Sequence, residues 1–94
     1  MTTMQFLTLL ISLLQKVLAG MASYTELQKV VDDAVINDEL PDDMPKAMLQ
    51  HIFDLQTDLE LIAEHQSTYA GSSSMYSQGD IVEKLSKYGE LLKK

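Results

Sequence analysis

The sequence contains no cysteine, no tryptophan and no arginine. Without cysteine, disulfide bonds and thiolate chemistry are excluded, and a reducing compartment such as the cytoplasm is the expected location. Seven lysines stand against fourteen acidic residues, which gives a formal net charge of −7. Because nucleic-acid binding needs clustered lysine and arginine to neutralise phosphates, we expect no direct binding to nucleic acid.

Long apolar runs are also missing. The most apolar segment is MTTMQFLTLLISLLQKVLAG at the N-terminus, and a cleaved signal peptide is one interpretation of it. However, no positive charge precedes the run, and it is too short and too interrupted to span a bilayer. Polar residues recur in it at helical spacing, which predicts a core helix of a soluble bundle. These residues are Gln5, Thr8, Ser12, Gln15 and Lys16.

The chain has 94 residues, of which 46% are hydrophobic and 6% aromatic, a composition suited to one domain of packed aliphatic helices. Helical periodicity predicts helices over about residues 5–19, 24–36, 45–66 and 80–93. Gly20 is a suitable C-cap for the first helix, and Ser23 with Glu26 matches a capping box at the second. The predicted fold is all-α, a single-domain (1–94) four-helix bundle of antiparallel type. The predicted core residues are Phe6, Leu10, Leu13, Val17, Leu27, Val30, Val31, Ala34, Val35, Met48, Ile52, Leu55, Leu59, Ile62, Ile81, Leu85, Tyr88 and Leu92.

Negative charge is concentrated in the middle of the chain. Residues 26–64 hold eleven acids and two lysines, a local net charge of −9, whereas residues 1–25 and 65–94 each carry +1. A field of this kind attracts a basic partner and accelerates its encounter.

The stretch NDELPDDMP, residues 37–45, places four acids and two prolines at the predicted turn before the third helix. Asp43 is placed to cap that helix, and acids before a helix N-terminus suit its dipole. The same argument does not explain Asp38 and Glu39, since the C-terminal end of the second helix disfavours negative charge.

The third helix has a polar face opposite its core stripe, made of Gln50, Asp54, Thr57, Asp58, Leu61, Glu64 and His65. Leu61 lies about 180° around the helix from Ile52. It is either a solitary exposed leucine or the anchor of an interface. Tyr69 and Tyr76, in the serine-rich loop that follows, are weaker candidates, chosen because aromatic residues often anchor interfaces.

No catalytic or cofactor-binding motif is present. His51 and His65 are about 21 Å apart along one helix and cannot share a metal ion within a chain. Bundle metal sites use inward carboxylates on facing helices, whereas these acids lie on an outer face. We therefore expect no cofactor, no metal and no enzymatic activity.

The segments LLQKVLAGMASYTELQKVV and ELPDDMPKAMLQHIFDLQTDLELIAEH, with the step Ile52–Phe53–Asp54, resemble the colicin D immunity protein family. That family includes helical immunity proteins of contact-dependent inhibition systems and related toxins. The resemblance covers most of residues 7–92, but STYAGSSSMYS replaces the acidic, proline-containing segment that such proteins often have after the long helix. It implies a cytoplasmic, non-enzymatic inhibitor whose carboxylates replace substrate phosphates in a nuclease active site.

Charge and resemblance together predict an immunity protein for a basic ribonuclease-type toxin, one that acts on tRNA. The alternatives are a phage or plasmid adaptor or homodimer that buries its own apolar surface and, least favoured, a small enzyme. The predicted contact residues are Asp54, Asp58, Leu61 and Glu64 on the third helix, Asp38, Glu39, Asp42 and Asp43 at the turn, and Tyr69 and Tyr76 in the loop.

Overall fold

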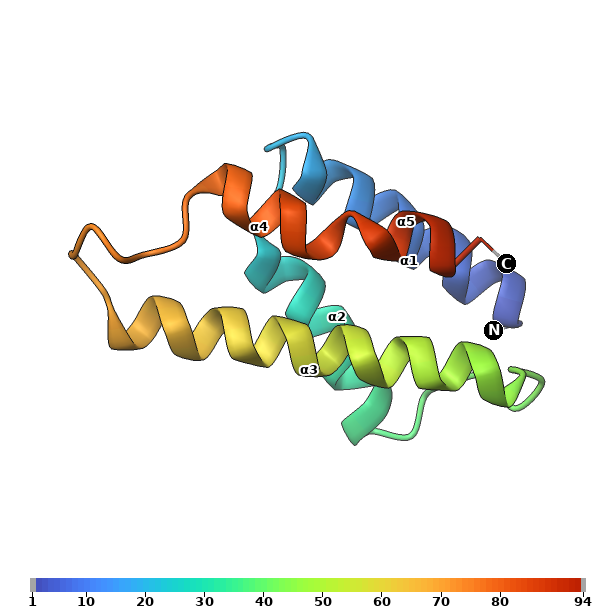
Figure 1. Ribbon diagram of the computed structural model, residues 1–94. Coiled ribbons are helices and arrows are strands. Elements are labelled where there is room, and N and C mark those ends of the chain that lie inside the picture. The colour runs from blue at the N-terminus through green and yellow to red at the C-terminus, as the bar shows by residue number, and fades with distance from the viewer. Residues whose placement is uncertain (1, 94) are drawn as a thin grey trace.

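The computed structural model describes residues 2–93. Within that range the chain forms helices and turns and no strand (Figure 1). The helices are α1 (Thr3–Leu18), α2 (Tyr24–Ile36), α3 (Lys46–Thr68), α4 (Gln78–Leu85) and α5 (Lys87–Leu91). Because α5 continues α4 along nearly the same line, the architecture is a four-helix bundle, and the predicted all-α fold is confirmed.

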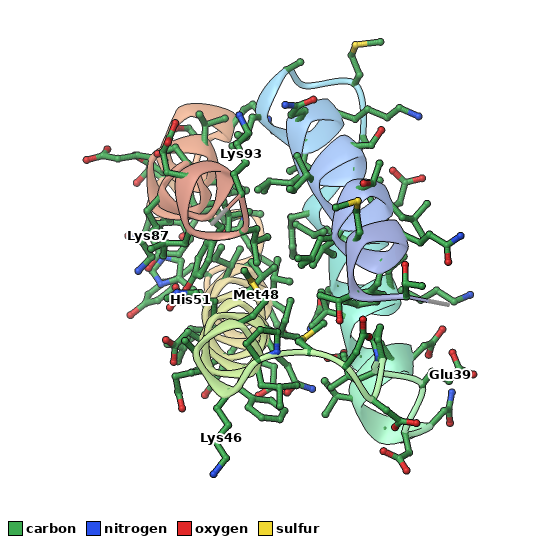
Figure 2. The ribbon with its side chains drawn as sticks, turned by 90° about the vertical axis from the view of Figure 1, so that its right-hand side faces the viewer. Glu39, Lys46, Met48, His51, Lys87 and Lys93 are labelled. Carbon is green, nitrogen blue, oxygen red and sulfur yellow. The ribbon has the colours of Figure 1, made fainter. Side chains whose placement is uncertain are left out.

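The helices form two layers. Viewed nearly along the bundle, α3 and the α4–α5 rod form one layer, and α1 and α2 form the other (Figure 2). α3 contacts α2, α4 and α5, while α1 contacts α2, α4 and α5. The molecule extends over 43 × 24 × 20 Å. No helix within residues 2–93 is long and apolar enough to cross a lipid bilayer.

Side chains fix the starts of three helices. Thr2 and Gln5 form a capping box at α1, Ser23 and Glu26 form the predicted one at α2, and Ser77 and Asp80 form a third at α4. Each box satisfies amides that a helix N-terminus otherwise leaves without a partner. The predicted bounds of α2 are those observed, whereas α1 begins two residues earlier than predicted because Thr2 supplies its cap.

The predicted cap of α3 is wrong. The N-cap residue of α3 is Pro45, and no side chain caps the helix. The carboxylate of Asp43 instead accepts hydrogen bonds from the backbone N–H and the hydroxyl of Thr3, at 3.1 and 2.7 Å. Asp43 therefore stabilises the N-terminus of α1, forty residues away in the sequence.

The end of α2 places Asp38 in a left-handed turn. Asp38 has a φ of 54°, the left-handed conformation usually held by glycine after a helix. The Glu39 N–H bonds to the Ala34 carbonyl at 2.9 Å and the Asp38 N–H to the Val35 carbonyl at 3.4 Å. These two hydrogen bonds form a Schellman motif. Glycine would adopt the left-handed conformation of this position at a lower steric cost than aspartate does.

The core agrees with the predicted stripes except at five residues. Leu14 and Met44 are buried although the predicted core does not include them, whereas Leu13, Val30 and Val35 are only partly buried at the edge of the core. The five polar residues predicted for the outer face of α1 are all exposed. The buried apolar residues are Phe6, Leu10, Leu14, Val17, Leu27, Val31, Ala34, Met44, Met48, Ile52, Leu55, Leu59, Ile62, Ile81, Leu85, Tyr88 and Leu92.

The fourth predicted helix is divided in two. It begins at Gln78, is interrupted at Ser86 and ends at Leu91, rather than running unbroken over 80–93. Gly89 donates its N–H to the Ser86 carbonyl, three residues back, at 3.1 Å. Glycine is a weak helix former, which favours this tighter turn.

Candidate functional site

The outer face of α3 carries two exposed apolar side chains. Phe53 and Leu61 are 40% and 57% exposed. They are eight residues apart with Thr57 midway, so the three side chains follow one ridge about 12 Å long. Sequence reasoning singled out Leu61 and missed Phe53 as a contact residue, although the spacing of two helical turns would have identified it.

Exposed carboxylates border this ridge. Asp54, Glu60 and Glu64 are all exposed, and only Asp54 has a side-chain partner, the Gln50 amide, which donates to it at 3.0 Å. Among residues 2–93 the one ion pair joins Lys87 and Asp58. The negative charge on the outer face of α3 is therefore not balanced by any lysine in the described part of the chain. We call Phe53, Asp54, Thr57, Glu60, Leu61 and Glu64 the α3 ridge.

Asp58 is not on that solvent face. Its side chain is 29% exposed and turns toward α5, where it accepts a hydrogen bond from the hydroxyl of buried Tyr88. The Lys87 ammonium lies 3.3 Å from the same carboxylate. Burial, and next the hydrogen bond to Asp58, raise the pKa of Tyr88 above its ordinary value of 10.0. Asp58 thus joins α3 to α5, a structural role that the sequence prediction did not include.

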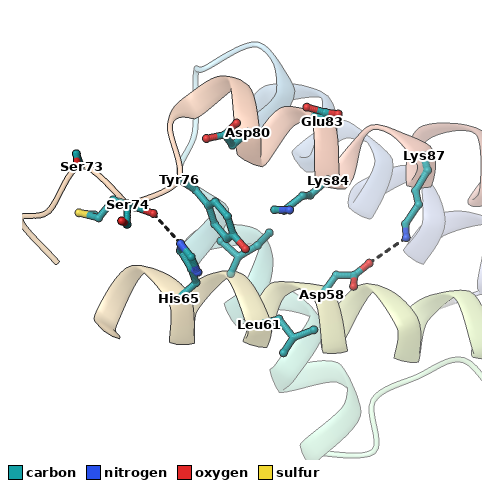
Figure 3. Close-up of a pocket in the computed structure, with 12 residues that line it drawn as sticks. Asp58, Leu61, His65, Ser73, Ser74, Tyr76, Asp80, Glu83, Lys84 and Lys87 are labelled. Carbon is teal, nitrogen blue, oxygen red and sulfur yellow. Dashed lines mark hydrogen bonds and ion pairs between the residues drawn. The ribbon is translucent and has the colours of Figure 1, made fainter. Parts of the chain in front are cut away.

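An open cleft of about 740 Å³ lies beside Leu61, between α3, the serine-rich loop and α4 (Figure 3). His65 stacks on Tyr76, with ring centroids 3.7 Å apart and planes at 10°. The Lys84 ammonium lies 4.6 Å from the centre of the Tyr76 ring, within range of a cation–π interaction. The cleft is lined by Asp58, Leu61, Ile62, His65, Ser73, Ser74, Met75, Tyr76, Asp80, Glu83, Lys84 and Lys87.

Two side chains of α3 hold the serine-rich loop. The Gln66 amide accepts from the Tyr76 N–H at 2.8 Å and donates to its carbonyl at 3.2 Å. His65 donates its Nε2–H to the Ser74 carbonyl at 2.8 Å. Tyr69 is 42% exposed and also lies against His65, at 4.5 Å between ring centroids. These contacts attach the second half of the loop to α3, and Tyr76 packs against His65.

The acidic turn forms a separate group. Asp38, Glu39 and Asp42 are exposed, whereas the carboxylate of Asp43 already accepts hydrogen bonds from Thr3. The turn precedes α3, and the cleft lies near the other end of this helix of 23 residues, about 35 Å long. The structure thus places Leu61 and Tyr76 in one cleft, and it places the turn acids apart from them.

Within residues 2–93 no three His, Asp or Glu side chains are grouped as a metal site would require. His65 faces the serine-rich loop, whereas His51 lies four turns earlier on α3. No protein-family model, curated protein or solved structure matches this chain.

Proposed function

We propose that this chain is an immunity-type inhibitor, which binds a basic ribonuclease domain and covers its active site with the α3 ridge. The observation that carries the proposal is the pairing of exposed Phe53 and Leu61 with acids that no lysine of residues 2–93 neutralises. Buried apolar anchors inside a polar rim are the usual composition of a protein-binding site.

The charge distribution supports a basic partner. The local charge of −9 over residues 26–64 includes both the α3 ridge and the turn acids. Such a field raises the association rate of a cationic protein more than it slows its dissociation. A ribonuclease cleft binds phosphates through cationic side chains, and the ridge carboxylates offer the same charge to that cleft.

The turn and the ridge are assigned different parts in binding. Asp38 and Asp42 are exposed on the turn, apart from the ridge, so they would steer the approach of the partner. Phe53 and Leu61 would be buried on binding, so they would set the lifetime of the complex.

Binding kinetics test the proposal. The proposal predicts that a neighbouring reading frame encodes a lysine- and arginine-rich toxin domain, and this domain is the partner to use, measured at two salt concentrations. Absence of such a frame would favour the adaptor instead. We expect Leu61→Ala to accelerate dissociation by roughly 30-fold, which corresponds to about 2 kcal/mol. We expect Asp38→Asn with Asp42→Asn to lower the association rate and flatten its salt dependence.

Met4→Ala is the matched control, because Met4 is an exposed apolar residue of α1, in the other layer of the bundle. It should leave both rates unchanged. If Leu61→Ala changes dissociation no more than Met4→Ala does, the α3 ridge is not the binding surface.

A further inference from the structure

A second surface lies in the other layer of the bundle. An open groove of about 390 Å³ runs between α1 and α2, with Phe6, Leu9, Val30 and Ala34 forming its apolar walls. Leu9 is 52% exposed there. Ala34 has no side-chain atom beyond Cβ, so little fills the space between its neighbours. The α3 ridge does not contribute to this groove.

Two carboxylates complete the lining, those of Asp33 and Glu39. Both residues are exposed, and within residues 2–93 neither side chain has a hydrogen-bonded or ionic partner. The Schellman motif fixes the backbone of Glu39, since its N–H bonds to Ala34. Figure 2 shows Glu39 at the outer edge of the α1–α2 layer, on the side away from α3. No lysine lines the groove among the described residues.

We propose that the α1–α2 groove binds a basic amphipathic helix of a partner protein. An apolar side chain of that helix enters between Leu9 and Val30, and lysine or arginine residues beside it pair with Asp33 and Glu39. Charge complementarity selects this occupant over a second copy of the chain. Two copies of the chain each carry a net charge of −7, and pairing their grooves would bring like-charged carboxylates together, which is unfavourable.

The groove and the α3 ridge lie on different layers, so this inference does not depend on the proposed inhibition of a ribonuclease. A single partner that covers both surfaces is compatible with the geometry only if it wraps around the bundle. Each surface is therefore tested with its own variants.

The test is an NMR titration with a synthetic amphipathic helix of leucine and lysine, about 15 residues long. We expect the largest amide shifts at Leu9, Val30 and Asp33. Asp33→Asn with Glu39→Gln should weaken binding roughly fivefold, because two rim ion pairs are lost. Glu83→Gln with Glu90→Gln removes the same charge from exposed sites on α4 and α5, outside the groove, and should weaken binding by less than about twofold.

Three results would overturn the proposal. Equal weakening by the two double variants would show that the peptide responds to the net charge of the protein and not to the acids of the groove. Shifts centred on α3 would place the peptide on the other layer. Shifts at Leu9 and Val30 on raising the concentration of the chain alone, without peptide, would make the groove a contact between copies.

Discussion

Asp43 caps a helix to which it is not adjacent in the sequence, since its carboxylate accepts both the backbone N–H and the hydroxyl of Thr3. Pro41 and Met44 are buried on either side of it, so the turn is anchored to the bundle while Asp43 faces α1. The turn thereby connects the start of α1 to the start of α3.

Asp43→Ala should lower the denaturation midpoint at neutral pH, because it removes the carboxylate that accepts two hydrogen bonds from Thr3 in the first turn of α1. The hydroxyl of Thr3 lowers the pKa of Asp43 below its ordinary value of 3.8. A lowered pKa in the folded state stabilises the fold above pH 3.8, and this contribution disappears as the pH falls through the folded-state pKa.

Urea denaturation of the wild type and Asp43→Ala at neutral pH and in acid measures this effect. Their difference should shrink in acid. Asp42→Asn is the control, since its side chain has no hydrogen-bond partner within residues 2–93, and it should match the wild type throughout. A difference that persists unchanged in acid would contradict the assigned role of the carboxylate.

Tyr88→Phe should cost about 1–2 kcal/mol of unfolding free energy, because the hydroxyl that donates to Asp58 is lost while the buried ring stays. The raised pKa of Tyr88 means that the folded state favours the protonated hydroxyl. Its contribution is present below the ordinary value of 10.0 and is lost as the pH rises above it. Unfolding measured at neutral pH and above pH 10 should show a larger alkaline loss for the wild type than for Tyr88→Phe. Equal losses of unfolding free energy in the two proteins would show that ionisation of Tyr88 does not cause the alkaline destabilisation.

Leu10→Ala should cost on the order of 2–5 kcal/mol, because Leu10 is fully buried in the bundle core. Leu13→Ala should cost clearly less, because Leu13 is only partly buried. A domain of this size has a total stability on the order of 5–10 kcal/mol, so Leu10→Ala should come close to unfolding it. Circular dichroism during urea denaturation ranks the two variants, and the reverse order would contradict the packing of α1.

Asp38→Gly should stabilise the chain by about 1 kcal/mol, because glycine adopts the positive φ of this position without steric cost. Asn37→Gly is the control. Asn37 has a φ of −90°, so glycine relieves nothing there and its flexibility should lower stability slightly. A stabilising Asn37→Gly, or a destabilising Asp38→Gly, would show that the left-handed turn is not the source of the cost.

The helices were predictable from sequence because their signals are local. The capping box of Ser23 and Glu26 and the apolar stripe of Leu27, Val31 and Ala34 all lie within a few turns of one another. The same holds for the core face of α3. Local hydrophobic period and caps are enough to predict four helices and a bundle.

The side-chain partners were not predictable in the same way. Asp58 meets Tyr88 and Asp43 meets Thr3 only after distant helices pack, and a helical wheel cannot show which acid faces a neighbouring helix. Two of the predicted contact acids are consequently occupied within the molecule. Phe53 was missed for another reason, since it directly follows Ile52 and lies only about 100° around the helix from the core stripe, whereas Leu61 lies opposite that stripe.

Growth rescue tests the central claim most directly. The basic toxin domain that the proposal predicts in a neighbouring reading frame is expressed in cells with the wild type, with Phe53→Ser and Leu61→Ser combined, or with Met4→Ser. We predict that the wild type and Met4→Ser restore growth, while the double α3 variant remains folded and fails to do so. No rescue by the wild type, with no complex detected between the purified proteins, would contradict the proposed immunity function.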